Sequence, residues 1–510
     1  MDSATSALDN PALRVPYDIL VEIFHAATDL YMYEVGQGPL FGIIGVCTGW
    51  RNAALECPSL WSTFWVDMYV DLVQTYLQRS RSCLLRIHLI ANIRLRPSRS
   101  DSRQYNLDTV QRMFRILADH SDRFWTLGFS GVDWPQLLPS FSGFRGRLSS
   151  LEMLDLDNEA LFETGEFQIA PELHTLTTLG PCLAGTTNLP HAQIRSLRIS
   201  WTRDSWGLRN DCIRQLESFP NLSSLTLEFK AGSEPSSVIY IIESMFDVHS
   251  AGITLPFLSY WKIQVPFKVP PLGWMLDHFK TPALETLDIA YFTQPSNLCD
   301  LFRRSQCSLK RLALRRCTIR GGDLLNILEL TPSLDSLVIE NGSVPTMVTN
   351  RFFDSLTFTA GRHPIVPVLR ELEITGQYCF SGPKVLEMVD SRVGRGLSVV
   401  EMVFFREALI MKEADVVRLD RAFKGLRGHG HGHGGQSLPA RPRTTSVFLG
   451  LRNGEGGLTS WTCVASRYAN TWCIRDIQHD CGTDRPAPVY YGSYRGYSSR
   501  DCTTHLITVV

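Results

Sequence analysis

A hydrophobic block of the form Leu-x-x-Leu-x-Leu, with isoleucine at some positions, recurs along most of the chain. Clear copies begin at Leu151, Ile194, Leu222, Leu258, Leu284, Leu309, Leu334 and Leu369, and weaker ones at Leu84, Phe124, Leu173 and Leu397. Successive copies start 21 to 40 residues apart, most often 25 to 28. A single block fits an ordinary strand or helix face. A series at this period is typical of a solenoid, whose units cover one another's apolar faces.

Several copies follow a helical pattern that ends at a proline. In residues 273–289 and 324–339 the change comes at Thr281-Pro282 and Thr331-Pro332, because proline cannot continue a helix. Each unit is therefore expected to pair a short parallel strand with a helix. The sequence predicts an α/β fold, a leucine-rich-repeat solenoid with a curved parallel sheet and outer helices, over residues 67–405.

Two amphipathic helices are predicted ahead of the repeats. Pro16 and Asp18 favour the start of the first helix, and Pro58 ends the second. The apolar positions are Ile19, Leu20, Ile23, Phe24 and Ala27 in the first helix and Ile43, Val46, Cys47, Trp50 and Ala54 in the second. A loop at residues 35–39 separates them. So small a unit cannot bury all these side chains by itself. Trp50, Trp61 and Trp65 are thus expected either to pack on the following domain or to face a partner protein.

Residues 13–66 resemble an F-box of the kind found at the start of many fungal proteins. That motif reads Leu-Pro-x-Glu-Ile/Leu-Leu-x-x-Ile-Phe, a loop, Val-Cys-x-x-Trp-Arg-x-x-Ala and Pro-x-Leu-Trp. It is matched by Pro16, Ile19, Leu20, Ile23, Phe24, Val46, Cys47, Trp50, Arg51, Ala54, Pro58, Leu60 and Trp61. Val15 stands where leucine is usual, and Thr48 and Gly49 replace a basic pair. The resemblance covers about a tenth of the chain.

The resemblance implies a substrate-recognition subunit of an SCF-type cullin–RING ubiquitin ligase, without catalysis of its own. Its partner would be the small adaptor that links F-box proteins to the ligase. The expected adaptor-binding residues are Val15, Pro16, Ile19, Leu20, Ile23, Phe24, Val46, Trp50 and Trp61, whereas Cys47 and Ala54 are expected in the helical core. A rival interpretation is a scaffold outside the ubiquitin system, whose F-box-like helices cap the solenoid.

The repeats supply a second predicted surface. Side chains that alternate with the leucines point away from the core, toward the concave face. The candidates for binding a target protein are Asp155, Asp157, Arg198, Tyr260, Lys262, Asp288, Arg311, Arg315, Glu340, Glu371 and Glu373. Their charge changes from acidic through basic to acidic along the chain, which suits a protein surface with its own charge pattern.

Composition narrows the function further. The chain has 510 residues, with 50 basic and 51 acidic side chains, a balance that argues against generic binding to a nucleic-acid backbone. The first ten residues lack the pattern of a secretory signal, and no apolar run is long enough to cross a bilayer. The 13 cysteines are odd in number and scattered through apolar segments, which favours buried thiols in the cytoplasm or nucleus.

The remaining motifs give weaker signals. Alternating histidines at 429, 431 and 433, a late cysteine cluster, a basic run at residues 93–103 and a tyrosine-rich tail are each best explained as solvated or low-complexity segments, so no metal or other cofactor is expected. No common catalytic motif is present, although an enzyme in the C-terminal extension is a third hypothesis. The predicted domains are a flexible N-terminus (1–12), the F-box (13–66), the solenoid (67–405), a terminal helix (406–427), and a Gly/His linker with a loosely ordered extension (428–510).

Overall fold

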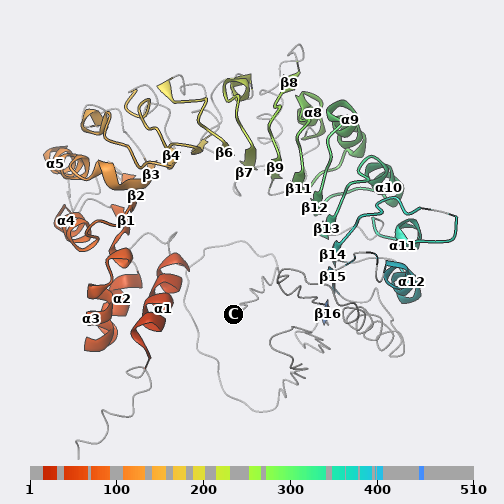
Figure 1. The fold of residues 1–510 in the computed structure, drawn as a ribbon, viewed down its shortest axis with the longest axis horizontal. Coiled ribbons are helices and arrows are strands. Elements are labelled where there is room, and N and C mark those ends of the chain that lie inside the picture. Colours follow the sequence, from red (N-terminus) through yellow and green to blue (C-terminus); the bar gives the residue numbers. More distant parts are fainter. Residues whose placement is uncertain are drawn as a thin grey trace, which may run out of the picture.

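The computed structural model is an arc of repeated strand-and-helix units with a small helical unit at its N-terminal end (Figure 1). The structure describes residues 15–30, 39–66, 70–91, 107–131, 141–156, 165–179, 188–201, 214–229, 252–265, 272–340, 347–361, 363–376, 380–392, 395, 397, 399–405 and 447–452. The predicted N-terminus (1–12) and terminal helix (406–427) lie outside these residues, as does all of 428–510 except one strand.

A single parallel sheet of 14 strands lines the inside of the arc. Its strands, in spatial order, are β1 (Thr63–Val66), β2 (Leu85–Ala91), β3 (Phe124–Gly131), β4 (Met153–Leu156), β5 (Thr175–Leu179), β6 (Ser196–Trp201), β7 (Ser224–Phe229), β9 (Tyr260–Gln264), β11 (Thr286–Ala290), β12 (Arg311–Arg315), β13 (Ser336–Glu340), β14 (Glu371–Gly376), β15 (Val399–Phe405) and β16 (Val447–Arg452). Every predicted block lies at a strand, which confirms the parallel repeat solenoid.

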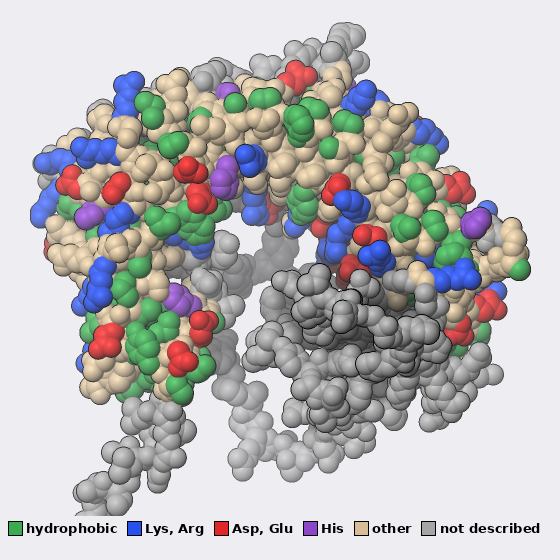
Figure 2. Space-filling model, viewed as in Figure 1, with side chains coloured by type: hydrophobic (Ala, Val, Ile, Leu, Met, Phe, Trp, Pro, Cys, Tyr) green, Lys and Arg blue, Asp and Glu red, His purple; other side chains and the backbone are tan. Residues whose placement is uncertain are grey.

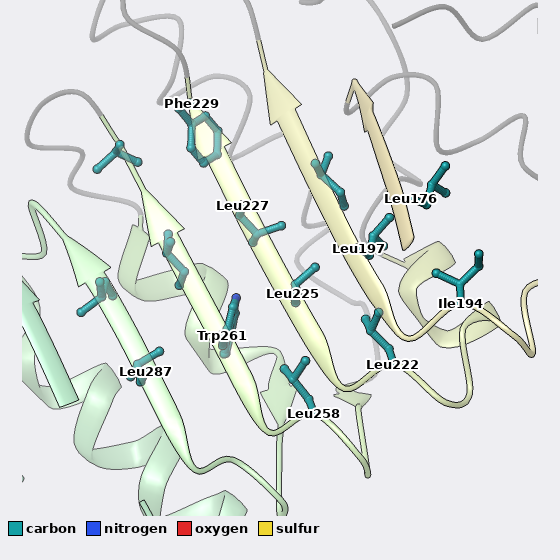
Figure 3. Close-up of a cluster of buried hydrophobic side chains, with 14 of the residues drawn as sticks. Leu176, Ile194, Leu197, Leu222, Leu225, Leu227, Phe229, Leu258, Trp261 and Leu287 are labelled. Carbon is teal, nitrogen blue, oxygen red and sulfur yellow. The ribbon is translucent and has the colours of Figure 1, made fainter. Parts of the chain in front are cut away.

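The repeated leucines align across the sheet. In β11 to β14, Leu287, Leu312, Leu337 and Leu372 are register partners, and all four are fully buried. Burial alternates along most strands, so one face of the sheet packs against the outer elements and the other faces the hollow of the arc. Figure 3 shows these rows of buried side chains on β5 to β11. Each row is covered by its neighbours, as stacking of incomplete units requires.

Helices cover the outer side of the arc (Figure 1). They are α4 (Val70–Arg79), α5 (Leu107–Ala118), α8 (Leu272–Asp277), α9 (Pro295–Ser305), α10 (Gly321–Glu329), α11 (Asn350–Leu356) and α12 (Gly382–Arg392), with short 3-10 turns at η3 (Ser121–Arg123), η5 (Ser142–Phe144) and η9 (Arg214–Ser218). Among the described residues, the outer side of β4 to β7 carries turns, whereas β11 to β14 carry α-helices. The units are therefore irregular, in line with their unequal spacing.

The two widest gaps between blocks are insertions. The strands on either side of the first gap, β2 and β3, pair directly, with α5 between them in the chain. The strands on either side of the second gap, β7 and β9, also pair directly. The short strand β8 (Ile253–Thr254) in that gap pairs instead with β10 (Phe279–Lys280) in a separate two-stranded sheet.

The N-terminal unit contains α1 (Tyr17–Leu30), α2 (Pro39–Val46), α3 (Thr48–Glu56) and the turn η2 (Pro58–Trp61). The prediction of one continuous second helix was wrong. Its backbone breaks at Cys47, whose φ of −158° is extended and whose thiol accepts the backbone N–H of Trp50 at 3.4 Å as the cap of α3. The break removes Val46 from the expected stripe: Val46 is 56% exposed, whereas Ile43 is buried.

Candidate docking surfaces

The helical unit exposes a set of apolar side chains that are not buried in the chain's own core. Tyr17, Ile19 and Ile23 of α1 are 49%, 48% and 45% exposed, and Val46 closes α2. Ile19 and Ile23 are four residues apart and so are neighbours on the helix surface. These four are half of the large exposed apolar side chains in the described part of the chain. Figure 2 shows hydrophobic side chains gathered on this unit.

Other predicted adaptor-binding residues lie beneath this surface. Leu20, Phe24 and Trp61 are buried in the chain's own core, and the Phe24 and Trp50 rings pack at 5.2 Å. Val15 and Trp50 are partly buried against the same core, while Pro16 is exposed. The structure thus divides the nine predicted residues into an exposed group, Pro16, Ile19, Ile23 and Val46, and a group that supports it from within, Val15, Leu20, Phe24, Trp50 and Trp61.

Trp61 joins the helical unit to the first repeat. Its indole N–H donates to the Ala54 carbonyl of α3 at 2.8 Å, and its ring packs against Tyr76 of α4 at 5.2 Å and beneath the Arg79 guanidinium at 4.3 Å. Burial raises the pKa of Tyr76 to about 12, which keeps its phenol neutral. Trp61 therefore packs on the following domain.

Several of the predicted target-binding side chains form cross-strand ion pairs on the concave side. Arg315 of β12 bridges two neighbouring strands, with Nε 3.1 Å from Asp288 Oδ1 and Nη1 3.1 Å from Glu340 Oε2. Burial lowers the pKa of Arg315, but the two carboxylates outweigh it and the net shift is upward. Arg316 Nε also reaches Glu340 Oε1 at 3.2 Å. The Arg315 guanidinium thus links three neighbouring strands, β11, β12 and β13, through ion pairs.

Two further ion pairs extend the pattern. Arg311 Nη1 lies 3.6 Å from Glu371 Oε2, and Arg198 Nη2 lies 2.6 Å from Glu228 Oε2 on the next strand. Arg316 and Glu228 were not among the predicted residues. The sequence could have indicated Glu228, because it follows Leu227 and continues the alternation of buried and concave positions in that block. Arg316 has left-handed backbone (φ 52°) beyond the end of β12, which the repeat pattern does not signal.

Three predicted concave residues make no side-chain hydrogen bond or ion pair with the rest of the described chain: Tyr260, Lys262 and Glu373. The register places Lys262 next to Asp288, and Tyr260 next to Thr286. Burial, followed by the Asp288 carboxylate, raises the pKa of Tyr260. The polar groups of these side chains can therefore bind a ligand without first breaking a contact within the described chain. Asp155 lies on β4 in the same alternation, and Asp157 is outside the described residues.

A second concave cluster, at the N-terminal end of the sheet, was missed. The Trp65 and His88 rings lie 4.3 Å apart, and His88 Nε2 shares a hydrogen bond of 3.0 Å with Ser130 Oγ. Burial lowers the pKa of His88 to about 4, so its ring is neutral at neutral pH. Trp65, His88 and Gly128 are register partners on β1, β2 and β3. The alternation in the weak block beginning at Leu84 would have indicated His88.

Within the described residues, no group of three or more His, Cys, Asp or Glu side chains is placed to hold a metal ion. None of the described helices combines the length and the apolar character needed to span a membrane. The histidine tract, the late cysteines, the basic run and the tyrosine-rich tail all lie outside those residues.

Comparison with known proteins finds similarity among solved structures. No protein-family model matches the sequence, and no curated protein matches it. Among solved structures, a chain from the crystal structure of the Rad7 and Elc1 complex in yeast is similar over 78% of this chain and 94% of that chain, at 15% sequence identity and a TM-score of 0.33.

Proposed function

We propose that the chain is the substrate-recognition subunit of an SCF-type ubiquitin ligase. Its helical unit docks the small adaptor of a cullin–RING ligase, and its arc holds a target protein in the cytoplasm or nucleus. The chain carries out no covalent step itself but raises the concentration of the target beside the ligase. The motif of residues 13–66 supports the adaptor, and the parallel arc supports a role in protein binding.

The exposure of Ile19, Ile23 and Val46 carries this proposal. A terminal cap of a repeat array needs an apolar inner face and a polar outer face. The helical unit has the inner face, through Trp61, but its outer face keeps isoleucines in water. These side chains are already about half buried, so completing their burial stabilises an interface by roughly 1 kcal/mol each. A protein partner that covers α1 and α2 accounts for apolar side chains that are otherwise left in water at a cost in free energy.

The rival function, a cap without an adaptor, draws on the Trp61 contacts with α4. These contacts, which join the unit to the first repeat, support a capping role. The capping contacts come from Trp61 in η2 and the docking residues lie on α1 and α2, so substitutions on α1 and α2 alone can separate the two functions.

The test is co-purification of the full chain with the adaptor. Ile19→Asp with Ile23→Asp is expected to abolish retention, because two carboxylates would be buried in an apolar interface. Val368→Asp is the matched control, since Val368 is 47% exposed on the arc and should leave retention unchanged. Circular dichroism checks that both variants remain folded. A wild-type chain that never retains the adaptor would refute the proposal.

For the target, we propose Tyr260, Lys262 and Glu373 as the first contacts. The arginines and carboxylates around them are paired with each other and must break those partly exposed ion pairs before they can bind anything else, at a small cost in free energy. Lys262→Ala is therefore expected to weaken target capture more than Glu371→Ala, as measured by pull-down with the same wild-type target.

A further inference from the structure

The chain is poor in lysine, and its lysines are unevenly placed. Of the 50 basic residues, eight are lysines, at positions 230, 262, 268, 280, 310, 384, 412 and 424. Residues 1–229 contain 19 arginines and no lysine. Lysine is ordinarily among the commonest residues in folded proteins. Solubility does not explain the absence of lysine from residues 1–229, since lysine and arginine both keep a surface charged.

The lysine-free stretch has a clear position in the fold. It includes the whole helical unit, strands β1 to β7 and helices α4 and α5. The basic side chains on this half of the arc in Figure 2 are therefore all arginines. Those classed as exposed are Arg51, Arg81, Arg112, Arg115, Arg145, Arg147, Arg195 and Arg198.

Some of these positions use the shape of the guanidinium. Arg51 Nε donates to the Ile44 carbonyl at 3.0 Å, and Arg198 makes two hydrogen bonds to Glu228. By contrast, the side chains of Arg112, Arg115 and Arg195 make no hydrogen bond, ion pair or ring contact with other described residues. Nothing in the described structure requires arginine rather than lysine at those three positions.

Arginine and lysine differ in one reaction that matters here. Ubiquitin is carried as a thioester, and a lysine ε-amine that has lost its proton attacks the thioester carbonyl. An isopeptide bond forms, the carbon–sulfur bond breaks, and the carrier thiol leaves with a proton. Lysine can supply the free amine, whereas the arginine guanidinium remains protonated and does not. A receptor that holds a target close to this thioester holds its own surface there too, at high effective concentration.

We infer that residues 1–229 form an acceptor-free zone, which the ligase cannot modify on lysine and which spares the receptor while its target is modified. This inference rests on the proposed function. Outside the zone, the amines of Lys310 and Lys384 are engaged by carboxylates: Lys310 Nζ lies 2.5 Å from Glu285, and Lys384 Nζ lies 2.9 Å from Asp354 and 2.8 Å from Glu387. Lys280 is exposed and has no side-chain partner in the described chain.

The test restores acceptors without changing charge. Arg112→Lys, Arg115→Lys and Arg195→Lys are combined in the full chain, which is assembled with adaptor, cullin–RING ligase, ubiquitin-charged conjugating enzyme and ubiquitin. The matched control replaces the same three residues with glutamine. We expect the lysine variant to be self-modified severalfold faster than wild type, with ubiquitin mapped by mass spectrometry to the new lysines, and the glutamine variant to match wild type.

Two negative results have different meanings, and adaptor binding measured on the same samples separates them. If the variant binds the adaptor and the assembly consumes charged ubiquitin, but the new lysines remain unmodified, the acceptor-free zone is refuted while the proposed function stands. If the wild-type chain neither binds the adaptor nor promotes ubiquitin transfer, both proposals fail.

Discussion

His88 shows how neighbours across the sheet determine a single concave position. Its ring lies against Trp65 and bonds Ser130, and a Cβ on Gly128 would come within 2.1 Å of its Nδ1. The imidazole therefore occupies the space that a side chain on β3 would take. Glycine at 128 is required for room and not for backbone conformation.

The lowered pKa of His88 predicts a pH dependence of stability. The unfolded chain takes up a proton on His88 near pH 6.5, whereas the folded chain does so only near pH 4. Folding therefore loses stability as the pH falls through this window, by about 3 kcal/mol in total if the shift is fully expressed. Melting temperatures at about pH 7.5 and about pH 5 should differ more for wild type than for His88→Gln. Equal differences in the two proteins would contradict the assignment.

Sequence alternation predicts which residues face the hollow of the arc but not which of them pair. Asp288, Arg315 and Glu340 were recognised as concave residues from the sequence. Their pairing depends on the strand register and on rotamers that no local pattern encodes. The same limit explains why Trp61 and Phe24, read as interface residues, are buried: hydrophobic character predicts burial without saying against what.

At the scale of elements, the helical unit is fixed by few but well-packed contacts. His25 Nε2 shares a 2.9 Å hydrogen bond with Ser59 Oγ, which ties α1 to η2, and Trp61 ties η2 to both α3 and α4. Trp61 therefore helps to fix the orientation of the docking helices relative to the arc. The sequence predicted the helices but left open whether Trp61 packs on the following domain or faces a partner, because its contacts Tyr76 and Arg79 belong to the next unit.

Replacing Trp61 should loosen this joint selectively. Trp61→Ala removes a fully buried ring and leaves the Ala54 carbonyl without its donor, for a cost of about 3 to 5 kcal/mol. Trp61→Phe keeps an aromatic ring in the same place but loses the hydrogen bond and part of the packing, for a smaller cost of about 1 to 3 kcal/mol. Hydrogen exchange is expected to speed up in α1 to α3 in the alanine variant, less so in the phenylalanine variant, and to stay unchanged in β11 to β14. A uniform increase along the chain would contradict this view.

At the scale of the molecule, the arc is stabilised by nearest neighbours. Within the described residues, every inner strand of the 14-stranded sheet pairs with the sheet strands that precede and follow it along the chain, and no strand pairs across the arc. The repeat period in the sequence was enough to predict this architecture. The two end strands could not be predicted as repeats, because β1 and β16 lie outside any Leu-x-x-Leu-x-Leu block.

A charge introduced into one buried row should therefore destabilise only the neighbouring repeats and not the whole arc. Leu287→Asp places a carboxylate in the fully buried core behind β11. We expect loss of hydrogen-exchange protection in β11 and in its neighbours β9 and β12, falling off before β2. The control is Gln264→Asp, because Gln264 is exposed on β9 and an added carboxylate there meets water. Complete unfolding by Leu287→Asp would show instead that the arc behaves as one cooperative unit.

The position of β1 has a consequence for the sheet's free edge. Among the described strands, this four-residue strand pairs only with β2. Its other side would offer unpaired backbone groups to another strand, yet the turn η2 and the helices lie at that end. An uncovered parallel edge is a template on which a second copy can add and polymerise. Cutting the chain after Val66 to obtain the repeats alone would also remove β1 and bare β2, so the shortened protein should form fibres or oligomers where the intact one does not.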